Sequence, residues 1–202
     1  MKLHFAPQSR AVRILWLCRE LGIEPELVRY TLGDPAMRAP EHIARHPLGR
    51  VPVLEDDGVV IYETGAIMHY ILERHGGGRL EPAAGDWPAR ALFLQWLHFA
   101  EGLIMPPINT IVVETVLLPP DRRNPEQVAW ARKLLNRTME AVERHLEGRT
   151  WLAGEAFTAA DVQTGHAVMM SMRLGADARP NMAAYRDRLL ARPACASALA
   201  ET

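Results

Sequence analysis

Glu63 and Thr64 stand directly before a helical pattern, where a polar pair could bind a charged ligand. The backbone N–H groups at a helix start favour an anion such as a carboxylate, and the Glu63 carboxylate could meet an ammonium group. A ligand with an α-amino acid head carries both charges on one carbon. The alternative is that Glu63 only complements the helix dipole or caps the helix, and the spacing alone favours that simpler role.

Ser9 stands in a loop directly before another helical pattern. A serine in this place is typical of an N-cap, because its side-chain oxygen accepts a hydrogen bond from the first turn of the helix. The same hydroxyl and N–H groups could stabilise an anion, including a thiolate. The two roles are compatible with each other.

Pro52 interrupts a strand pattern between Val51 and Val53. Proline has no backbone donor and is normally confined to strand edges, strand starts or bulges. The strand pattern alone does not explain why a proline stands at this position.

The remaining reactive residue types give weaker signals. His42 and His46 are spaced like two metal ligands on a helix, but Pro47 follows directly and no HExxH motif or nearby cysteine completes a site. The chain has no GxSxG, P-loop or GxGxxG fingerprint, so hydrolase, NTPase and Rossmann functions have no support. We expect no bound metal. We also expect the aromatic and histidine side chains of the long helix after Pro88 to be core or interface residues: Trp96, His98 and Phe99.

A capping motif lies late in the chain. Thr158 and Asp161 have the spacing of a capping box, and Phe157 and Val162 are placed as a hydrophobic staple. Capping explains these residue types, so we predict that they begin a helix.

The composition bounds the class of protein. The chain has 202 residues, 49% apolar and 23% charged, with a net charge of −1, which is ordinary for a soluble globular protein. This charge gives no sign of a nucleic-acid partner. Cys18 and Cys195 lie far apart and form no disulfide framework, so we expect a reducing, cytoplasmic setting. The sequence predicts no signal peptide and no segment approaching the length of a membrane span, and hence no membrane partner.

The first third of the chain alternates strand and helix patterns in the order β-α-β-α-β-β-α. A β-α-β unit followed by a hairpin implies a mixed sheet with helices packed on it. We expect strands at residues 2–5, 27–32, 51–54 and 59–62, with a turn at 56–58. We expect helices at residues 10–21 and 64–74, and one or two helical turns within 35–46.

The second half shows helical patterns only. Gly76-Gly77-Gly78 is the clearest break, which divides the chain into a domain of residues 1–76, a linker of 77–87 and an all-helical domain of 88–202. Pro106-Pro107 should kink or break the first long helix. The expected helices are residues 88–116, 125–147, 158–174 and 182–191.

Four separated segments together resemble the cytosolic glutathione transferase family, in particular bacterial members with a serine near the N-terminus. The segments are SRAVRILWLCRELG, HPLGRVPVLEDDGVVIYETGAI, LQWLHFAEG and WLAGEAFTAADV, and their order and spacing match over nearly the whole chain. The resemblance implies an α/β, thioredoxin-like N-terminal domain (βαβαββα) followed by an all-α, all-helical C-terminal domain, in agreement with the patterns above. It also implies an enzyme of detoxification that uses glutathione as co-substrate and pairs as a homodimer.

The resemblance assigns a glutathione site to the residues noted above. It implies a cis bond between Val51 and Pro52, which lets the Val51 backbone pair with the cysteinyl part of glutathione as an added strand would. It places the γ-glutamyl head on Glu63 and Thr64. The glycyl carboxylate is then expected near basic side chains, Arg50 and, as a second candidate, Arg38.

The nucleophile would be the thiol of glutathione itself, which is mostly protonated at neutral pH because a free thiol has a pKa of about 8.5. The resemblance implies that Ser9 stabilises the thiolate at the start of the first helix and that Arg10 adds positive potential. Backbone N–H groups are an alternative to the Ser9 hydroxyl. A serine rather than a cysteine here argues against the branch that forms a mixed disulfide, and Cys18 is expected to be buried packing.

The resemblance also places a pocket for a small hydrophobic electrophile between the domains. Its candidate residues are Phe5, Ala6, Met105, Ile108 and Asn109. The homodimer would pair through the helix near Tyr62–Tyr70 and the long helix after Pro88. Two alternatives stay open: a glutathione-dependent peroxidase or isomerase that uses the same thiolate, and a non-catalytic binding module. The intact Glu63-Thr64 pair favours an enzyme.

Overall fold

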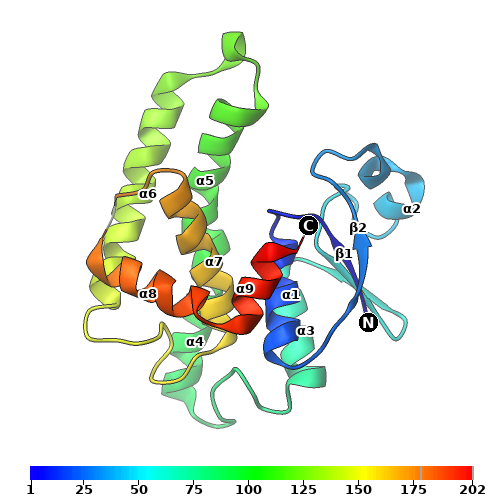
Figure 1. Cartoon of the computed structure of the whole chain (residues 1–202), viewed down its shortest axis with the longest axis vertical. Helices are drawn as coiled ribbons and strands as arrows, with labels where there is room; N and C mark the ends of the chain where they lie inside the picture. The colour runs from blue at the N-terminus through cyan, green and yellow to red at the C-terminus, as the bar shows by residue number, and fades with distance from the viewer. Residues whose placement is uncertain (178, 202) are drawn as a thin grey trace. The chain divides into compact units, whose positions relative to one another are not determined.

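The computed structural model describes residues 1–177 and 179–201, which form two compact units (Figure 1). The first unit combines Met1–Glu81 with Leu190–Thr202, and the second is Pro82–Leu189. Among the described residues every named strand lies in the first unit. This arrangement is the predicted thioredoxin-like domain followed by a helical domain.

The first unit is built on a four-stranded mixed sheet in the order β2-β1-β3-β4. β1 pairs in parallel with β2, and it pairs antiparallel with β3, which in turn pairs antiparallel with β4. The side chains of the central strands are the most buried, since Leu3, Phe5, Val53 and Leu54 have no exposed surface. The strand bounds are β1 Lys2–Phe5, β2 Glu26–Arg29, β3 Val53–Asp56 and β4 Val59–Tyr62.

Two predicted strand boundaries are wrong by a few residues. β3 starts at Val53 rather than 51, because Pro52 has no N–H to donate and the ladder with β1 and β4 begins one residue after it. β2 ends at Arg29 rather than 32, and Thr31 to Gly33 are exposed. The hairpin turn forms as predicted, with a φ of 48° at Asp57 and 81° at Gly58.

Helix α1, Ala11–Glu20, lies in the core of the first unit. It packs against β1, against α3 (Thr64–Ile71) and against α9 (Pro193–Ala200). Ala11 to Cys18 are all buried, as expected of a helix covered on several sides. Cys18 is fully buried, as the sequence predicted.

The sequence did not predict α9. It lies beside α1 (Figure 1). The Arg192 guanidinium holds it by donating to both carboxylate oxygens of Glu20, at 2.7 and 2.6 Å. Beyond the helix, Glu201 accepts from Arg19 and Arg29. By its contacts this C-terminal segment groups with the first unit.

The predicted connection 35–46 holds two short helical turns, η1 Pro35–Arg38 and α2 Pro40–Ile43. Asp34 caps the first turn by accepting from the Ala36 N–H at 2.8 Å. Helix α3 continues into the π-helical turn η2, Leu72–Gly76, and Gly77 ends it with a φ of 59°. The glycine break predicted at this point therefore forms.

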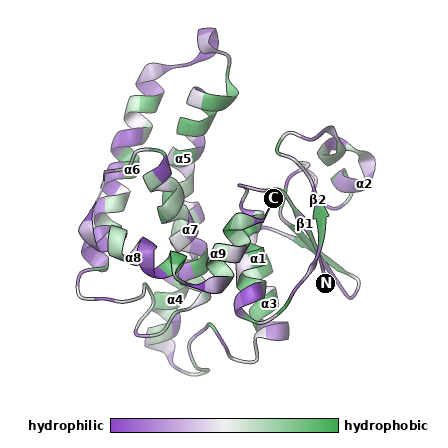
Figure 2. Cartoon of the chain, viewed as in Figure 1, coloured by the Kyte–Doolittle hydropathy of each residue, from purple (hydrophilic) through white to green (hydrophobic). Residues whose placement is uncertain are grey.

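The second unit consists of helices packed around α7, whose side chains are buried along most of its length. α7 packs against α4, and α5 packs against α6. Figure 2 shows the hydrophobic colour over much of α5 and the hydrophilic colour over much of α6. The helix bounds are α4 Trp87–Phe99, α5 Met105–Val112, α6 Pro125–His145, α7 Ala159–Arg173 and α8 Pro180–Leu190, with the 3-10 turn η5 Pro120–Arg122.

The interruption predicted at Pro106-Pro107 is confirmed. α4 passes into a π-helical turn, η3 Ala100–Ile104, directly before α5 carries the two prolines in its first turn. Proline cannot donate to the carbonyl four residues back, so the regular ladder gives way to wider hydrogen bonding at this place. A second π-helical turn, η4 Val113–Leu117, ends the run.

The run Trp87–Leu117 is long and apolar enough, by length and composition alone, to cross a membrane. The expectation that no segment approaches that length is therefore wrong. The finding is weak evidence for a span, because a core helix passes the same test. Phe93, Leu97 and Ile104 of this run are core residues with no exposed surface.

The capping box predicted at the start of α7 is confirmed. The Thr158 N–H donates to Asp161 Oδ2 at 2.9 Å. Asp161 also accepts from the Leu152 N–H and from the Tyr185 hydroxyl, both at 2.9 Å on Oδ1. Burial raises the pKa of Asp161, and its partners explain why a fully buried carboxyl is tolerated.

Candidate functional site

Three loops of the first unit meet at one end of the sheet. The ladder pairs His4 with Val53 and Val53 with Tyr62. The end of β1, the start of β3 and the end of β4 therefore lie side by side. Three segments consequently leave the sheet at the same end of its strands: the loop to Ser9, the Val51-Pro52 segment and the Glu63-Thr64 pair. We call this end the site end of the sheet.

Glu63 joins β4 to α3 in an unusual conformation. Its φ is 73° and its ψ is 118°, a region that residues other than glycine seldom occupy. The side chain is exposed and makes no capping hydrogen bond to α3, so the simple capping role is not what the structure shows. Thr64, the first residue of α3, is 3% exposed. Such an outlier at a helix start is typical of a functional position.

The bond between Val51 and Pro52 is cis, as predicted. The backbone of Val51 makes no hydrogen bond to another backbone group of the residues that the structure describes. The Arg50 carbonyl accepts from His42 Nε2 at 2.9 Å. The Val51 backbone thus lies just before β3, at the site end of the sheet, with its own N–H and C=O free of backbone partners among the described residues, so an extended peptide could pair with it.

Ser9 closes the turn before α1. Its hydroxyl donates to the Ala6 carbonyl at 2.7 Å, and its oxygen accepts from the Ala11 N–H at 3.0 Å. The N-cap position of α1 is Arg10 rather than the predicted Ser9, and Ser9 stands one residue earlier, where its oxygen receives the N–H of the first helical residue. The single hydroxyl proton is already donated, so donation to a thiolate requires the hydroxyl to rotate away from Ala6.

Two arginines border the Val51 segment. Arg50 is exposed beside it, and Arg38 is exposed at the end of η1. A Cβ built at Gly49 would lie 3.2 Å from Arg38 Cδ, which places the Arg38 side chain next to this loop. Both cations are available for a carboxylate. Arg10 is half-buried at the start of α1.

His46 interacts electrostatically with two charged residues of this site, Glu63 and Arg50. Burial lowers its pKa, the charge of Glu63 opposes that change, and Arg50 adds to it. Its ring packs on Tyr62 with centroids 4.5 Å apart, and its Nδ1 accepts from the Leu48 N–H at 3.2 Å. The charges of Glu63 and Arg50 therefore both affect the pKa of His46, in opposite directions.

The two histidines considered as metal ligands take part in hydrogen bonds instead. His42 donates to the Arg50 carbonyl and lies 3.3 Å from the Tyr30 hydroxyl, and His46 accepts from the Leu48 N–H. Within residues 1–177 and 179–201 no group of three potential ligands is placed to hold a metal. Sequence reasoning missed the role of His42, although its spacing from His46 drew attention to it.

The electrophile candidates belong to both units. Phe5 and Ala6 are fully buried in the first unit. Met105 and Ile108 are buried in the second unit, and Asn109 is exposed there. Their role as a pocket stays a prediction.

Comparison with known proteins gives the family. The family models "Glutathione S-transferase, N-terminal domain" and "Glutathione S-transferase, C-terminal domain" match residues 1–73 and 104–193. Glutathione S-transferase 4 of Zea mays is 35% identical over 193 residues, which cover 90% of this chain and 83% of the relative. The chain belongs to the glutathione S-transferase family.

Solved structures agree in fold. A sphingomonad glutathione S-transferase, crystallised with glutathione, is 28% identical with a TM-score of 0.85 and covers 99% of this chain and 98% of its own. One from Actinobacillus pleuropneumoniae is also 28% identical, with a TM-score of 0.79 over 98% of this chain and 90% of its own. By sequence alone, elongation factor 1-gamma of Equus caballus is 33% identical over 126 residues, which are 62% of this chain and 27% of that protein.

Proposed function

We propose that this chain is a serine-type glutathione transferase, similar to bacterial members of the family, that conjugates the thiol of glutathione to small hydrophobic electrophiles. The observation that carries the proposal is that the segments with Ser9, Val51-Pro52 and Glu63-Thr64 all leave the sheet at its site end. The relatives named as glutathione S-transferases, one of them crystallised with glutathione, support it.

Each part of glutathione has a partner of suitable chemistry at the site end of the sheet. Glu63 and the N-terminus of α3 would bind the ammonium and carboxylate of the γ-glutamyl head. The Val51 backbone would pair with the cysteinyl residue. The basic side chains of Arg50 and Arg38 would bind the glycyl carboxylate.

The reaction itself needs little from the protein beyond thiolate stabilisation and alignment. The thiol gives up its proton to solvent, and the thiolate sulfur attacks the electrophilic carbon. The new C–S bond forms as the bond from that carbon to its leaving group breaks, for example the C–Cl bond of an aromatic halide, which releases chloride. The helix start at Ser9 and Arg10 favours the negative sulfur. The Ser9 hydroxyl can join by turning its proton from Ala6 to the sulfur.

The location and assembly of the protein are also proposals. We propose a cytoplasmic enzyme that acts as a homodimer. Large apolar side chains that stay exposed along the second half of the long helical run support the pairing: Leu103, Val113, Val116 and Leu117.

Ser9→Ala tests the catalytic assignment. We expect kcat with 1-chloro-2,4-dinitrobenzene to fall at least tenfold while the affinity for glutathione changes less, because one donor to the thiolate is lost. Ser9→Thr, which keeps a hydroxyl, is the matched control and should retain most of the turnover. If Ser9→Ala turns over as fast as the wild type, backbone N–H groups stabilise the thiolate and Ser9 is only a cap.

A non-catalytic binding module is the second candidate, favoured by the match to elongation factor 1-gamma. Wild-type protein that is retained on immobilised glutathione, yet shows no turnover with aromatic halides, epoxides or organic hydroperoxides, would establish this function instead. Faster reduction of hydroperoxides than conjugation of halides would identify a peroxidase.

A further inference from the structure

A continuous chain of four polar contacts connects the centre of the sheet to the Arg50 carbonyl. His4 Nε2 lies 2.6 Å from Glu55 Oε1, and His4 Nδ1 lies 3.0 Å from the Tyr30 hydroxyl. The same hydroxyl lies 3.3 Å from His42 Nδ1. His42 Nε2 completes the chain at 2.9 Å from the Arg50 carbonyl oxygen. We name these five groups the histidine–tyrosine relay.

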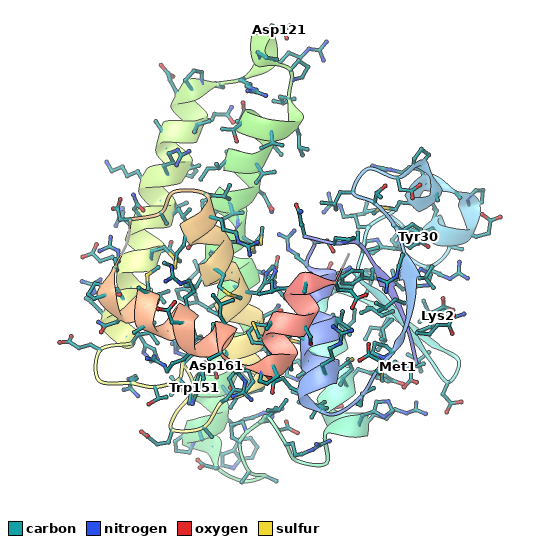
Figure 3. All side chains as sticks on the ribbon, viewed as in Figure 1. Met1, Lys2, Tyr30, Asp121, Trp151 and Asp161 are labelled. Carbon is teal, nitrogen blue, oxygen red and sulfur yellow. The ribbon has the colours of Figure 1, made fainter. Side chains whose placement is uncertain are left out.

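The relay is assembled from distant parts of the first unit. His4 lies in β1, Tyr30 directly after β2, His42 in α2 and Glu55 in β3. Figure 3 labels Tyr30 at the end of β2 that faces the segment carrying α2. The three rings pack together, with centroids 5.9, 5.4 and 5.0 Å apart. His4 and His42 are 3% and 2% exposed, so water cannot easily replace their partners.

When both histidines are neutral, the relay has one polar contact more than it has protons to place in those contacts. Its two ends, the Glu55 carboxylate and the Arg50 carbonyl, can only accept. Four contacts therefore need four protons, whereas neutral His4, neutral His42 and Tyr30 supply three. One added proton, which makes one histidine an imidazolium, completes all four hydrogen bonds.

The distances indicate which contact lacks a proton. The 2.6 and 2.9 Å end contacts require His4 and His42 each to carry their proton on Nε2. Tyr30 then donates to the nearer Nδ1, that of His4, and faces the lone pair of His42 at 3.3 Å. A relay with one further proton would have a donor for this contact as well.

The surrounding charges agree with this assignment. Burial lowers the pKa of His4, which favours its neutral form, and burial raises the pKa of Tyr30, which keeps its proton. The hydrogen bond from His4 lowers the pKa of Glu55, so this end stays a carboxylate. The other charged groups that act on the relay are Arg45, which donates to Glu55 at 2.9 Å, Asp34 near Tyr30, and His46 near His42.

We propose that the histidine–tyrosine relay is a proton-dependent positioning device for the Arg50–Val51 backbone, which it holds in place for a peptide ligand more firmly when it has taken up one proton. The inference rests on the proposed function, since the peptide is taken to be glutathione. His4, Tyr30 and His42 act only through the Arg50 carbonyl and are positioning residues.

S-Methylglutathione is the probe, because its sulfur carries no proton that titrates near neutral pH. Titration calorimetry at pH 6.0 and 8.0 should show tighter binding to the wild type at pH 6.0, by about two- to tenfold, the range expected for one hydrogen bond. Tyr30→Phe keeps the ring and removes the hydroxyl, and it should abolish most of this difference. Tyr70→Phe, which loses a bond to Asp56 in the same unit, should retain it.

His42 variants separate positioning from general folding. His42→Gln keeps an N–H that can reach the Arg50 carbonyl but removes the ring nitrogen that faces Tyr30, so its affinity should stay near that of the wild type and vary less with pH. His42→Leu should bind about two- to tenfold more weakly at both pH values. Equal pH dependence in the wild type, Tyr30→Phe and His42→Gln would overturn the proposal and assign the dependence to His46.

A ligand-free measurement separates this proposal from the proposed function. Imidazole ¹⁵N spectra of the wild type between pH 5 and 8 should show one proton taken up by the His4–His42 pair, and Tyr30→Phe should change the chemical shifts of both rings. This result with no binding of S-methylglutathione would reject the proposed function and leave the relay as a titrating unit. Uptake of two independent protons would reject the relay.

Discussion

Glu63 occupies a backbone conformation that glycine would adopt with less strain. Its φ of 73° is not needed for capping, because its side chain makes no capping hydrogen bond to α3. A conformation of this kind costs about 1–3 kcal/mol and persists where the surrounding structure imposes it. The gain at this position is an exposed carboxylate beside the first N–H groups of a helix, where opposite charges of one ligand can both be met.

Glu63→Gln tests this role at the scale of one charge. We expect the affinity for glutathione to fall about tenfold, because a hydrogen bond to a charged group contributes about 1.5–3 kcal/mol. The urea midpoint should not change, since the side chain is exposed. Glu126→Gln, an exposed residue of α6, is the control for loss of one surface charge. Unchanged affinity in Glu63→Gln would remove the ammonium contact from the proposed site.

Ser9 shows which contacts of a single residue can be predicted from the sequence and which cannot. Its position before a helix predicted an N-cap. The N-cap is Arg10, one residue later, although the Ala11 N–H does donate to the Ser9 oxygen. The bond from its hydroxyl to the Ala6 carbonyl could not be predicted, because it depends on how the loop after β1 bends. The same limit applies to His4, Tyr30 and His42, which come together only through the sheet order and the position of α2.

Gly49 controls how the loop before Pro52 is built. Its φ is 57°, and an added Cβ would lie 2.4 Å from the Met37 carbonyl oxygen. Gly49→Ala should therefore lower the free energy of unfolding by about 1–3 kcal/mol and weaken glutathione binding, because the loop that carries Arg50 must shift. Gly33→Ala is the matched control, since Gly33 has a φ of 86° and no atom within 4 Å of an added Cβ.

The comparison of these two variants isolates the steric contact from the cost of positive φ. Denaturant unfolding measures stability and calorimetry measures binding. If both variants lose the same stability and neither loses affinity, close packing at Gly49 does not shape the site.

Most elements could be predicted because their patterns are local. β1 and β4 have the predicted bounds, and the break at Pro106-Pro107 follows from the missing N–H groups. Helix α9 was missed, since its sequence PACASALA has no amphipathic pattern and it is held by contacts with α1. The bounds of β3 depend on the pairing of Val53 with two strands, which no local pattern contains.

The order of the strands brings the candidate site together. The segments that carry Ser9, Pro52 and Glu63 are far apart in sequence. Because β1, β3 and β4 are neighbouring strands, each of these segments leaves the sheet at its site end. A single recognised segment would not specify the site. The agreement of all three segments with one peptide ligand is the reason to prefer glutathione over an unrelated anion.

The proposed homodimer gives a prediction for the whole molecule. Val116 and Leu117, at the end of the long helical run, are 65% and 68% exposed, and adjacent apolar side chains of this kind often mark an interface. We expect the wild type to sediment as a dimer and Val116→Lys/Leu117→Lys to dissociate at micromolar concentration, with its helical circular dichroism unchanged. Trp130→Lys changes an equally exposed residue of α6, 65% exposed, and should remain dimeric. A wild type that sediments as a monomer would exclude the dimer, and a double variant that stays dimeric would place the interface elsewhere, for example on the helix that begins at Thr64.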